Sequence, residues 1–139
     1  YCGVGLFSVF LAPHLKEVIG VEASPSAEDD FMYNLEEFQN VAFYPAAVEE
    51  VLPHLDPAPD LILVDPPRGG LSGEALDGIC ALHPEQLTYV SCDPATLARD
   101  VKRLTAHGYR LIQCTPLDMF PQTYHIESVN VFQKSSLKV

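Results

Sequence analysis

The chain has little positive charge. Among its 139 residues only eight are Lys or Arg, against nineteen Asp and Glu, and the formal net charge is −11. Proteins that hold nucleic acid unaided usually offer a basic face, because neutralising phosphates supplies most of the sequence-independent affinity. A nucleic-acid partner therefore requires a local basic patch, such as the bases between Arg99 and Arg110, or a further domain.

Long apolar runs and paired cysteines are also lacking. No apolar run approaches membrane-spanning length, and no signal peptide opens the sequence. The four cysteines form no C-x-x-C pair (Cys2, Cys80, Cys92 and Cys114). This spacing argues against a zinc or iron–sulfur site in the chain and fits a reducing compartment. We therefore expect a cytoplasmic protein with no membrane segment and no metal.

Apolar runs alternate with helical patterns along the chain. The length of 139 residues predicts one domain, over 1–139, and the alternation predicts an α/β sandwich with a mostly parallel sheet. One helix is expected from about Ser24, as its cap, to Phe38. The continuously apolar run 61–65 is typical of a strand that is buried on both faces. The other strands are expected at 18–22, 41–44, 87–90, 109–117 and 127–133.

The chain opens at a strand-to-helix turn. Tyr1-Cys2-Gly3-Val4-Gly5 leads into a helix expected from Leu6 to about Leu15. Because such a turn follows a strand, we expect that the first strand is truncated and that the chain is a piece of a longer protein.

The same turn predicts a nucleoside cofactor. Gly3 and Gly5 permit a tight backbone turn against a ligand at a helix N-terminus. Glu22 ends the next strand, where a carboxylate can accept hydrogen bonds from both ribose hydroxyls. The dinucleotide fingerprint requires a third glycine at the position of Ser8, so the pattern favours S-adenosylmethionine over NAD.

Asp65-Pro66-Pro67-Arg68 ends the apolar run at 61–65. The carboxyl edge of a parallel sheet is where α/β proteins bind ligands. A carboxylate at Asp65 needs a partner, which a cofactor ammonium or a substrate group would provide. The two prolines stiffen the loop and aim Arg68, which either steers a phosphate or a base carbonyl or forms a structural ion pair.

Cys92 stands where an apolar run turns into a helix. Asp93 suits the N-cap and Pro94 the first helical position. A thiol at that place lies near unpaired N–H groups and the positive end of the helix dipole, which favour the thiolate. The alternative is that Cys92 is a small buried apolar residue at a strand end.

These motifs resemble, in their order, the RNA uracil-5-methyltransferases. The segments that carry the resemblance are Tyr-Cys-Gly-Val-Gly, Val-Glu-Ala-Ser, Asp-Pro-Pro-Arg, Ser-Cys-Asp-Pro-Ala-Thr-Leu-Ala-Arg-Asp and Gln-Thr-Tyr-His-Ile-Glu-Ser. The resemblance implies a class I S-adenosylmethionine-dependent methyltransferase, a Rossmann-like three-layer sandwich, that acts on a uridine of tRNA or rRNA. It implies that Cys92 is the nucleophile and Glu127 the base, and that Tyr1, Gly3, Glu22 and Asp65 bind the cofactor.

The resemblance also implies a catalytic domain alone, the C-terminal part of a longer protein without its RNA-binding domain. His125, beside Glu127, is then expected to order its loop rather than to catalyse. Cys92, Glu127 and Asp65 should meet at one sheet edge, and the last strand should run antiparallel beside the strand at 109–117. Two alternatives remain: an amino-group nucleic-acid methyltransferase, which needs no thiolate, and a non-catalytic truncated remnant.

Overall fold

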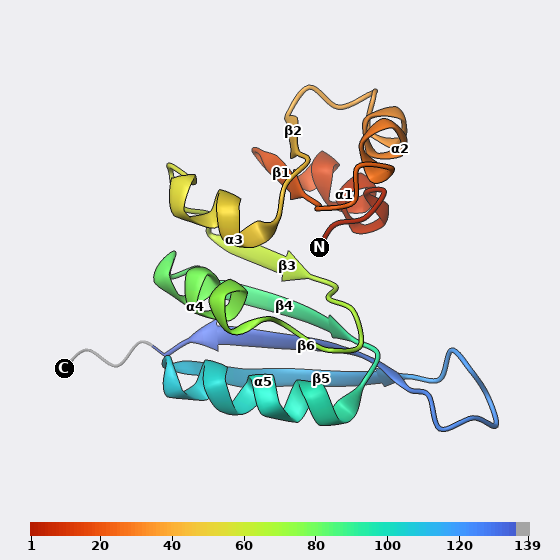
Figure 1. Cartoon of the computed structure of the whole chain (residues 1–139), viewed down its shortest axis with the longest axis vertical. Coiled ribbons are helices and arrows are strands. Elements are labelled where there is room, and N and C mark those ends of the chain that lie inside the picture. The colour runs from red at the N-terminus through yellow and green to blue at the C-terminus, as the bar shows by residue number, and fades with distance from the viewer. Residues whose placement is uncertain (136–139) are drawn as a thin grey trace. The chain divides into compact units, whose positions relative to one another are not determined.

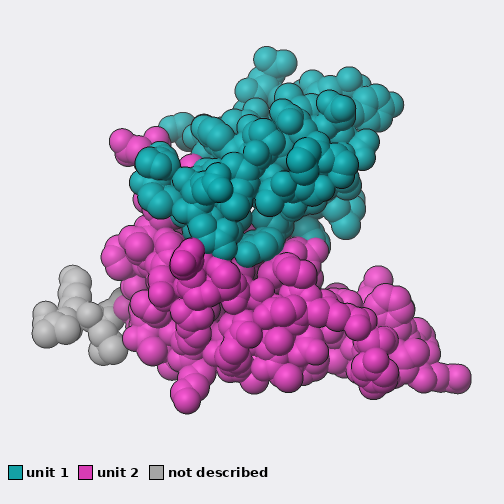
Figure 2. All heavy atoms as spheres, viewed as in Figure 1, with its two compact units in different colours: residues 1–54 teal, residues 55–139 magenta. Residues whose placement is uncertain are grey.

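The structure is a computed structural model, and it describes residues 1–135. The chain divides into two compact units, residues 1–54 and the residues from Leu55 onward, which Figure 2 colours separately. Each unit combines helices with strands (Figure 1). The α/β character expected from the alternation of apolar and helical patterns is therefore found in both units.

The first unit is built around two short parallel strands. Val18 pairs with Val41 and Val21 with Tyr44. Phe31 is fully buried, and its ring centroid lies 4.6 Å from that of Phe43. The elements are α1 (Leu6–Leu11), a 3-10 turn (Ala12–His14), β1 (Val18–Val21), α2 (Ala27–Asn34), β2 (Val41–Tyr44), α3 (Val48–Val51) and a second 3-10 turn (Leu52–His54).

The helix expected from Ser24 to Phe38 is shorter than its pattern suggested, because α2 runs from Ala27 to Asn34. Ser24 does not cap it. The backbone N–H of Ser24 donates to the Glu22 carboxylate at 3.0 Å, and its hydroxyl lies 2.9 Å from that of Ser26. Ser24, which the sequence pattern assigned to the helix as its cap, is therefore bonded to the carboxylate of Glu22.

The second unit holds a four-stranded mixed sheet in the order β3-β4-β6-β5. The strand β6 pairs antiparallel with both β4 and β5, which confirms the direction and the place expected for the last strand. The elements are β3 (Leu61–Val64), α4 (Gly73–Ala81), β4 (Gln86–Ser91), α5 (Pro94–Ala106), β5 (Tyr109–Leu117) and β6 (Glu127–Lys134). Figure 1 shows α4 and α5 on the same side of this sheet.

Two expectations about the strands are wrong. A single hydrogen-bonded sheet was expected. Within residues 1–135 the strands instead form two sheets, β1-β2 and β3-β4-β6-β5, with no main-chain pairing between them. The strand β3 was expected to be buried on both faces, but only Val64 is buried, while Leu61, Ile62 and Leu63 stay partly exposed. Helices α4 and α5 cover the same side of the sheet, so an apolar run does not by itself ensure burial on both faces.

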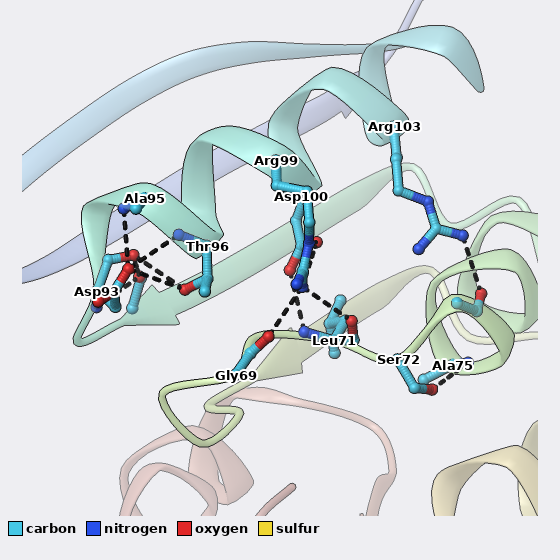
Figure 3. A network of polar contacts seen from close by, with 12 residues as sticks. Gly69, Leu71, Ser72, Ala75, Asp93, Ala95, Thr96, Arg99, Asp100 and Arg103 are labelled. Atoms are coloured by element: carbon cyan, nitrogen blue, oxygen red, sulfur yellow. Dashed lines mark hydrogen bonds and ion pairs between the residues drawn. The ribbon is translucent and has the colours of Figure 1, made fainter.

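A buried carboxylate ties the loop after β3 to α5 (Figure 3). Asp100 has no exposed surface, and its carboxylate accepts from the N–H of Leu71, the hydroxyl of Tyr89 and the guanidinium of Arg99, each at 2.9 Å. Arg99 also donates to the carbonyl of Gly69 at 2.9 Å. Burial, and then the bond to Asp100, raise the pKa of Tyr89, so its hydroxyl remains a donor.

Replacement of Asp100 is expected to destabilise the second unit strongly. In Asp100→Ala the buried N–H of Leu71 and the hydroxyl of Tyr89 lose their acceptor, which costs about 3 kcal/mol of unfolding free energy. Asp77→Ala is the control, because Asp77 pairs with Arg103 at an exposed position and such pairs contribute about 1 kcal/mol or less. Urea denaturation followed by circular dichroism compares the two, and equal losses would contradict the assignment of Asp100.

Candidate functional site

Cys92 lies at the junction of β4 and α5. Ser91, the last residue of β4, is buried, and its hydroxyl accepts from the N–H of Asp93 at 3.2 Å. The Asp93 carboxylate accepts from the N–H groups of Ala95 and Thr96, both at 2.9 Å, as expected of the helix cap. Cys92 is a half-buried free cysteine between Ser91 and Asp93, both of which are engaged in these hydrogen bonds.

The register of β4 and β6 determines which part of β6 lies at the end of β4 that leads into Cys92. The strands are antiparallel, and Ser91 pairs with Ser128. Cys92 is the next residue beyond Ser91, and Glu127, the first residue of β6, directly precedes Ser128. Successive positions of an antiparallel ladder lie opposite each other. The backbone therefore brings Cys92 and Glu127 to the same end of the sheet.

Asp65 reaches the same edge from β3. It directly follows Val64, which pairs in parallel with Tyr89 of β4. The pKa of the Asp65 carboxyl is raised, first because protein atoms displace water from it and second because the Glu127 carboxylate lies close by. Two neighbouring carboxylates make this edge suited to a cationic ligand group.

Arg68 lies between the start of α5 and the loop before β6. Its guanidinium is 3.2 Å from Nδ1 of His125, and its carbonyl accepts from the hydroxyl of Thr96 at 3.0 Å. The pKa of Asp93 is lowered, first by the N–H of Thr96 and also by the charge of Arg68. Within residues 1–135 Arg68 has no carboxylate partner at ion-pair distance. The structural ion pair that the sequence left open is thus not formed.

The glycine turn of the first unit carries the other candidate residues. Gly3 has a φ of +52°, and a Cβ placed there would meet no atom within 4 Å. Its N–H donates to the Glu22 carboxylate at 3.1 Å, beside the bond from Ser24. Tyr1 is half-buried just before the turn, and its nitrogen donates to the carbonyl of Val21 at 2.6 Å.

Glu22 is held in its ionised form. Partial burial opposes ionisation, but the N–H groups of Ser24 and Gly3 lower the pKa of Glu22 below its usual value.

Gly5 differs from Gly3, because a Cβ at Gly5 would lie 2.5 Å from the side chain of Leu35. Packing inside the unit accounts for the glycine at position 5, whereas Gly3 stays open on its outer side.

Sequence reasoning missed the residues that hold the second unit's site in place. Asp100 falls within the apolar stripe of α5, between Leu97 and Leu104 at helical spacing. An acid in such a stripe is the only signal that pointed to a buried network. The contact between Arg68 and His125 joins residues 57 positions apart, and no local pattern predicts it.

The part of the chain that the structure describes contains no cluster of three His, Cys, Asp or Glu side chains that could hold a metal ion. Among the same residues, none of the helices has both the length and the apolar character needed to cross a membrane.

Comparison with known proteins identifies related chains. The family model described as tRNA (uracil-5-)-methyltransferase matches residues 56–135. An uncharacterized RNA methyltransferase of Chlorobaculum tepidum is 43% identical over 97% of this chain and 29% of its own length. One of Enterococcus faecalis is also 43% identical, over 97% of this chain and 31% of its own length. The chain thus spans about a third of the length of these relatives.

Solved structures give the fold class. The tRNA (uracil-54, C5)-methyltransferase of Pyrococcus abyssi, in complex with S-adenosyl-L-homocysteine, matches with a TM-score of 0.82 and 36% identity over 95% of this chain and 32% of that one. A precorrin-6y C5,15-methyltransferase of Geobacter metallireducens, with a TM-score of 0.77 and 20% identity, covers 96% of this chain and 76% of that one and shows the fold alone. The class I, Rossmann-like methyltransferase fold is confirmed.

The proximity of Asp65 and Glu127 is open to direct measurement. In Glu127→Gln the carboxylate beside Asp65 is gone, so the pKa of Asp65 is expected to fall, while desolvation keeps it above the ordinary value. Carbon-13 NMR of the carboxyl groups follows the titration. Glu85→Gln, before the opposite end of β4, is the control and should leave Asp65 unchanged. An Asp65 titration that is the same in both variants would refute the proximity.

Proposed function

This chain belongs to the tRNA (uracil-5-)-methyltransferase family, and on that premise we propose that it forms the catalytic domain of an enzyme that methylates carbon 5 of a uridine in tRNA or rRNA. The observation that supports the proposal is the β4–β6 register, in which the last pair, Ser91 and Ser128, directly adjoins Cys92 and Glu127, with Asp65 following β3 at the same end. We further propose that the domain is the C-terminal part of a longer cytoplasmic protein.

Cys92 acts as the nucleophile in this proposal. Carbon 5 of uracil is a poor nucleophile by itself. Addition of the Cys92 thiolate to carbon 6 places the electron pair of the 5,6 double bond on carbon 5, which becomes enolate-like and able to take a methyl group. The half-buried position of Cys92 at the junction of β4 and α5 supports this role, because the thiol stays partly accessible at the end of the sheet where β6 begins.

Glu127 acts as the general base. After methylation, carbon 5 still carries its proton. Glu127 removes this proton, the electron pair restores the double bond, and the thiolate of Cys92 leaves carbon 6. A base for this step must lie beside the nucleophile, and the strand register supports that placement.

The residues of the first unit fit S-adenosylmethionine. A carboxylate offers about four lone-pair sites, and the backbone donors at Glu22 do not use all of them, so the Glu22 carboxylate can still accept from a ribose hydroxyl. The open outer side of Gly3 allows close approach, and Tyr1 precedes the turn. The cofactor supplies an electrophilic methyl group. For Asp65, in the second unit, we propose a cofactor-binding role on the ground of the family motif, as an acceptor for an ammonium group.

Arg68 is proposed to hold the RNA. Its guanidinium is exposed, has no carboxylate partner within the described residues, and is positioned by His125 and by the bond from Thr96 to its carbonyl. A phosphate or a base carbonyl would complete its hydrogen bonding.

An amino-group methyltransferase is the second candidate for the function. It requires neither a cysteine nor a base at this edge, whereas the register brings both together.

The order of the chemical steps gives a test in the complete protein. Glu127→Gln is expected to allow thiolate addition and methyl transfer but to stall before proton removal, because an amide cannot take the proton. Methylated RNA should then remain bonded to Cys92 through denaturation, and released product should fall by about 100-fold or more.

A denaturing gel with a radiolabelled methyl donor measures both outcomes. Cys92→Ala should give neither adduct nor product, and Cys114→Ala is the matched control, because Cys114 is an exposed cysteine on β5. If Cys92→Ala still methylates RNA, the amino-group alternative replaces the proposal. If Glu127→Gln releases product at the parental rate, another residue is the base.

The cofactor role of Glu22 gives a separate test. Glu22→Ala is expected to weaken S-adenosyl-L-homocysteine binding by about 10- to 100-fold, because hydrogen bonds to a charged group are worth roughly 1.5–3 kcal/mol. Calorimetric titration measures the affinity. Glu17→Ala removes an exposed carboxylate just ahead of β1 and should have no effect. Equal affinity for both variants would remove Glu22 from the proposed cofactor site.

A further inference from the structure

The loop between β5 and β6 displays aromatic rings that the unit's core does not use. Tyr124 is 89% exposed and Phe120 51%. The ring centroid of Tyr124 lies 4.1 Å from that of His125, and the ring of Phe120 meets His125 edge-on at 6.1 Å. Burial of an apolar ring stabilises a fold, and a ring that remains this exposed contributes little stability. The exposure of Tyr124 therefore calls for an explanation other than packing.

The loop holds these rings in a defined arrangement. The N–H and the hydroxyl of Thr123 both donate to the carbonyl of Phe120, at 3.2 and 2.8 Å. The hydroxyl of Thr123 in turn accepts from the N–H of His125 at 3.2 Å. A surface that is already ordered loses less conformational entropy when it binds a ligand.

The rings are linked to Arg68 and are close in sequence to Glu127. Tyr124 is three residues before Glu127, and its neighbour His125 contacts the guanidinium of Arg68. An exposed aromatic ring next to an exposed guanidinium is a combination that binds single-stranded nucleic acid, where the ring stacks on a base and the cation faces a phosphate. In a chain with a net charge of −11, such a local cation is the kind of feature that an RNA partner requires.

We propose that Tyr124 stacks on the nucleobase adjacent to the target uridine and so positions the RNA strand, while His125 supports the ring and keeps Arg68 at the neighbouring phosphate. The proposal rests on the proposed function for the nature of the partner. Because every base has an aromatic face, the contact tolerates any neighbouring base and selects an unpaired strand rather than a sequence.

The test measures RNA binding by the complete protein. The probe is a short single-stranded oligoribonucleotide with one uridine between adenosines, and fluorescence anisotropy gives its dissociation constant. Tyr124→Ala is expected to raise that constant by about 5- to 150-fold, the range for loss of one base–aromatic stack. Tyr124→Phe keeps the ring and should bind as the parent does.

Two controls separate stacking from general damage. Tyr33→Ala removes a tyrosine that is 73% exposed on α2 and should leave RNA binding unchanged. Affinity for S-adenosyl-L-homocysteine should be the same in Tyr124→Ala and in the parent, which shows that the variant is folded.

A second probe identifies the stacked base. With abasic nucleotides on both sides of the uridine, the parent should bind as weakly as Tyr124→Ala binds the adenosine-flanked probe. Tyr124→Ala should lose no further affinity on the abasic probe. The proposal would be overturned if the losses of affinity caused by Tyr124→Ala and by the abasic nucleotides were additive. It would also be overturned if Tyr124→Ala bound RNA as tightly as the parent. If the parent binds RNA through Tyr124 yet forms no 5-methyluridine, the proposed function fails while this inference stands.

Discussion

The antiparallel pairing of β6 with β4 is the constraint on which the candidate site depends. Cys92 and Glu127 are 35 positions apart in the chain, and the main-chain pairing of β4 with β6 brings them to one end of the sheet. A slip of one residue would turn every side chain of β6 to the opposite face. Burial prevents that slip, because Asn130 and Phe132 alternate with more exposed residues and are themselves fully buried.

Polar contacts add to this selection of register. The amide of Asn130 donates to the carbonyl of Tyr89 at 3.2 Å and lies 2.9 Å from the hydroxyl of Ser128. In another register the amide would be buried without these acceptors, which costs free energy. The hydrogen bonds of Asp100 and Arg99 to Leu71 and Gly69 hold the segment after Arg68 against α5. Buried polar bonds thus determine where the loops at this edge lie.

Charge is distributed in a way that fits the two proposed ligands. Asp65 and Glu127 concentrate negative charge where a cationic cofactor group is proposed to bind. Arg68 places positive charge beside the ring of His125, where RNA is proposed to bind. The strongly acidic chain therefore needs no general basic face for the contacts proposed at this edge, since one positioned guanidinium and an exposed ring serve locally.

The sequence by itself determined the local structure. The bounds of β2 and β5 matched their apolar patterns, and Asp93 caps α5 as its residue type predicted, because these features depend on neighbours in the chain. The helix after β1 was placed wrongly at both ends, because it begins at Ala27 and ends at Asn34, and the hydroxyl of Ser24 lies against that of Ser26 rather than capping the helix. The motifs around Cys92 and Glu127 also identified the family.

Only the tertiary structure decided which of these residues meet. The division of the strands into two sheets, the partial exposure of β3, the burial of Asp100 and the contact of Arg68 with His125 all depend on groups distant in the chain. Sequence periodicity records which side of an element is apolar, but it holds no information on the partner that covers that side. Contacts between distant residues are set by strand order and register, and those emerge only when the whole core packs.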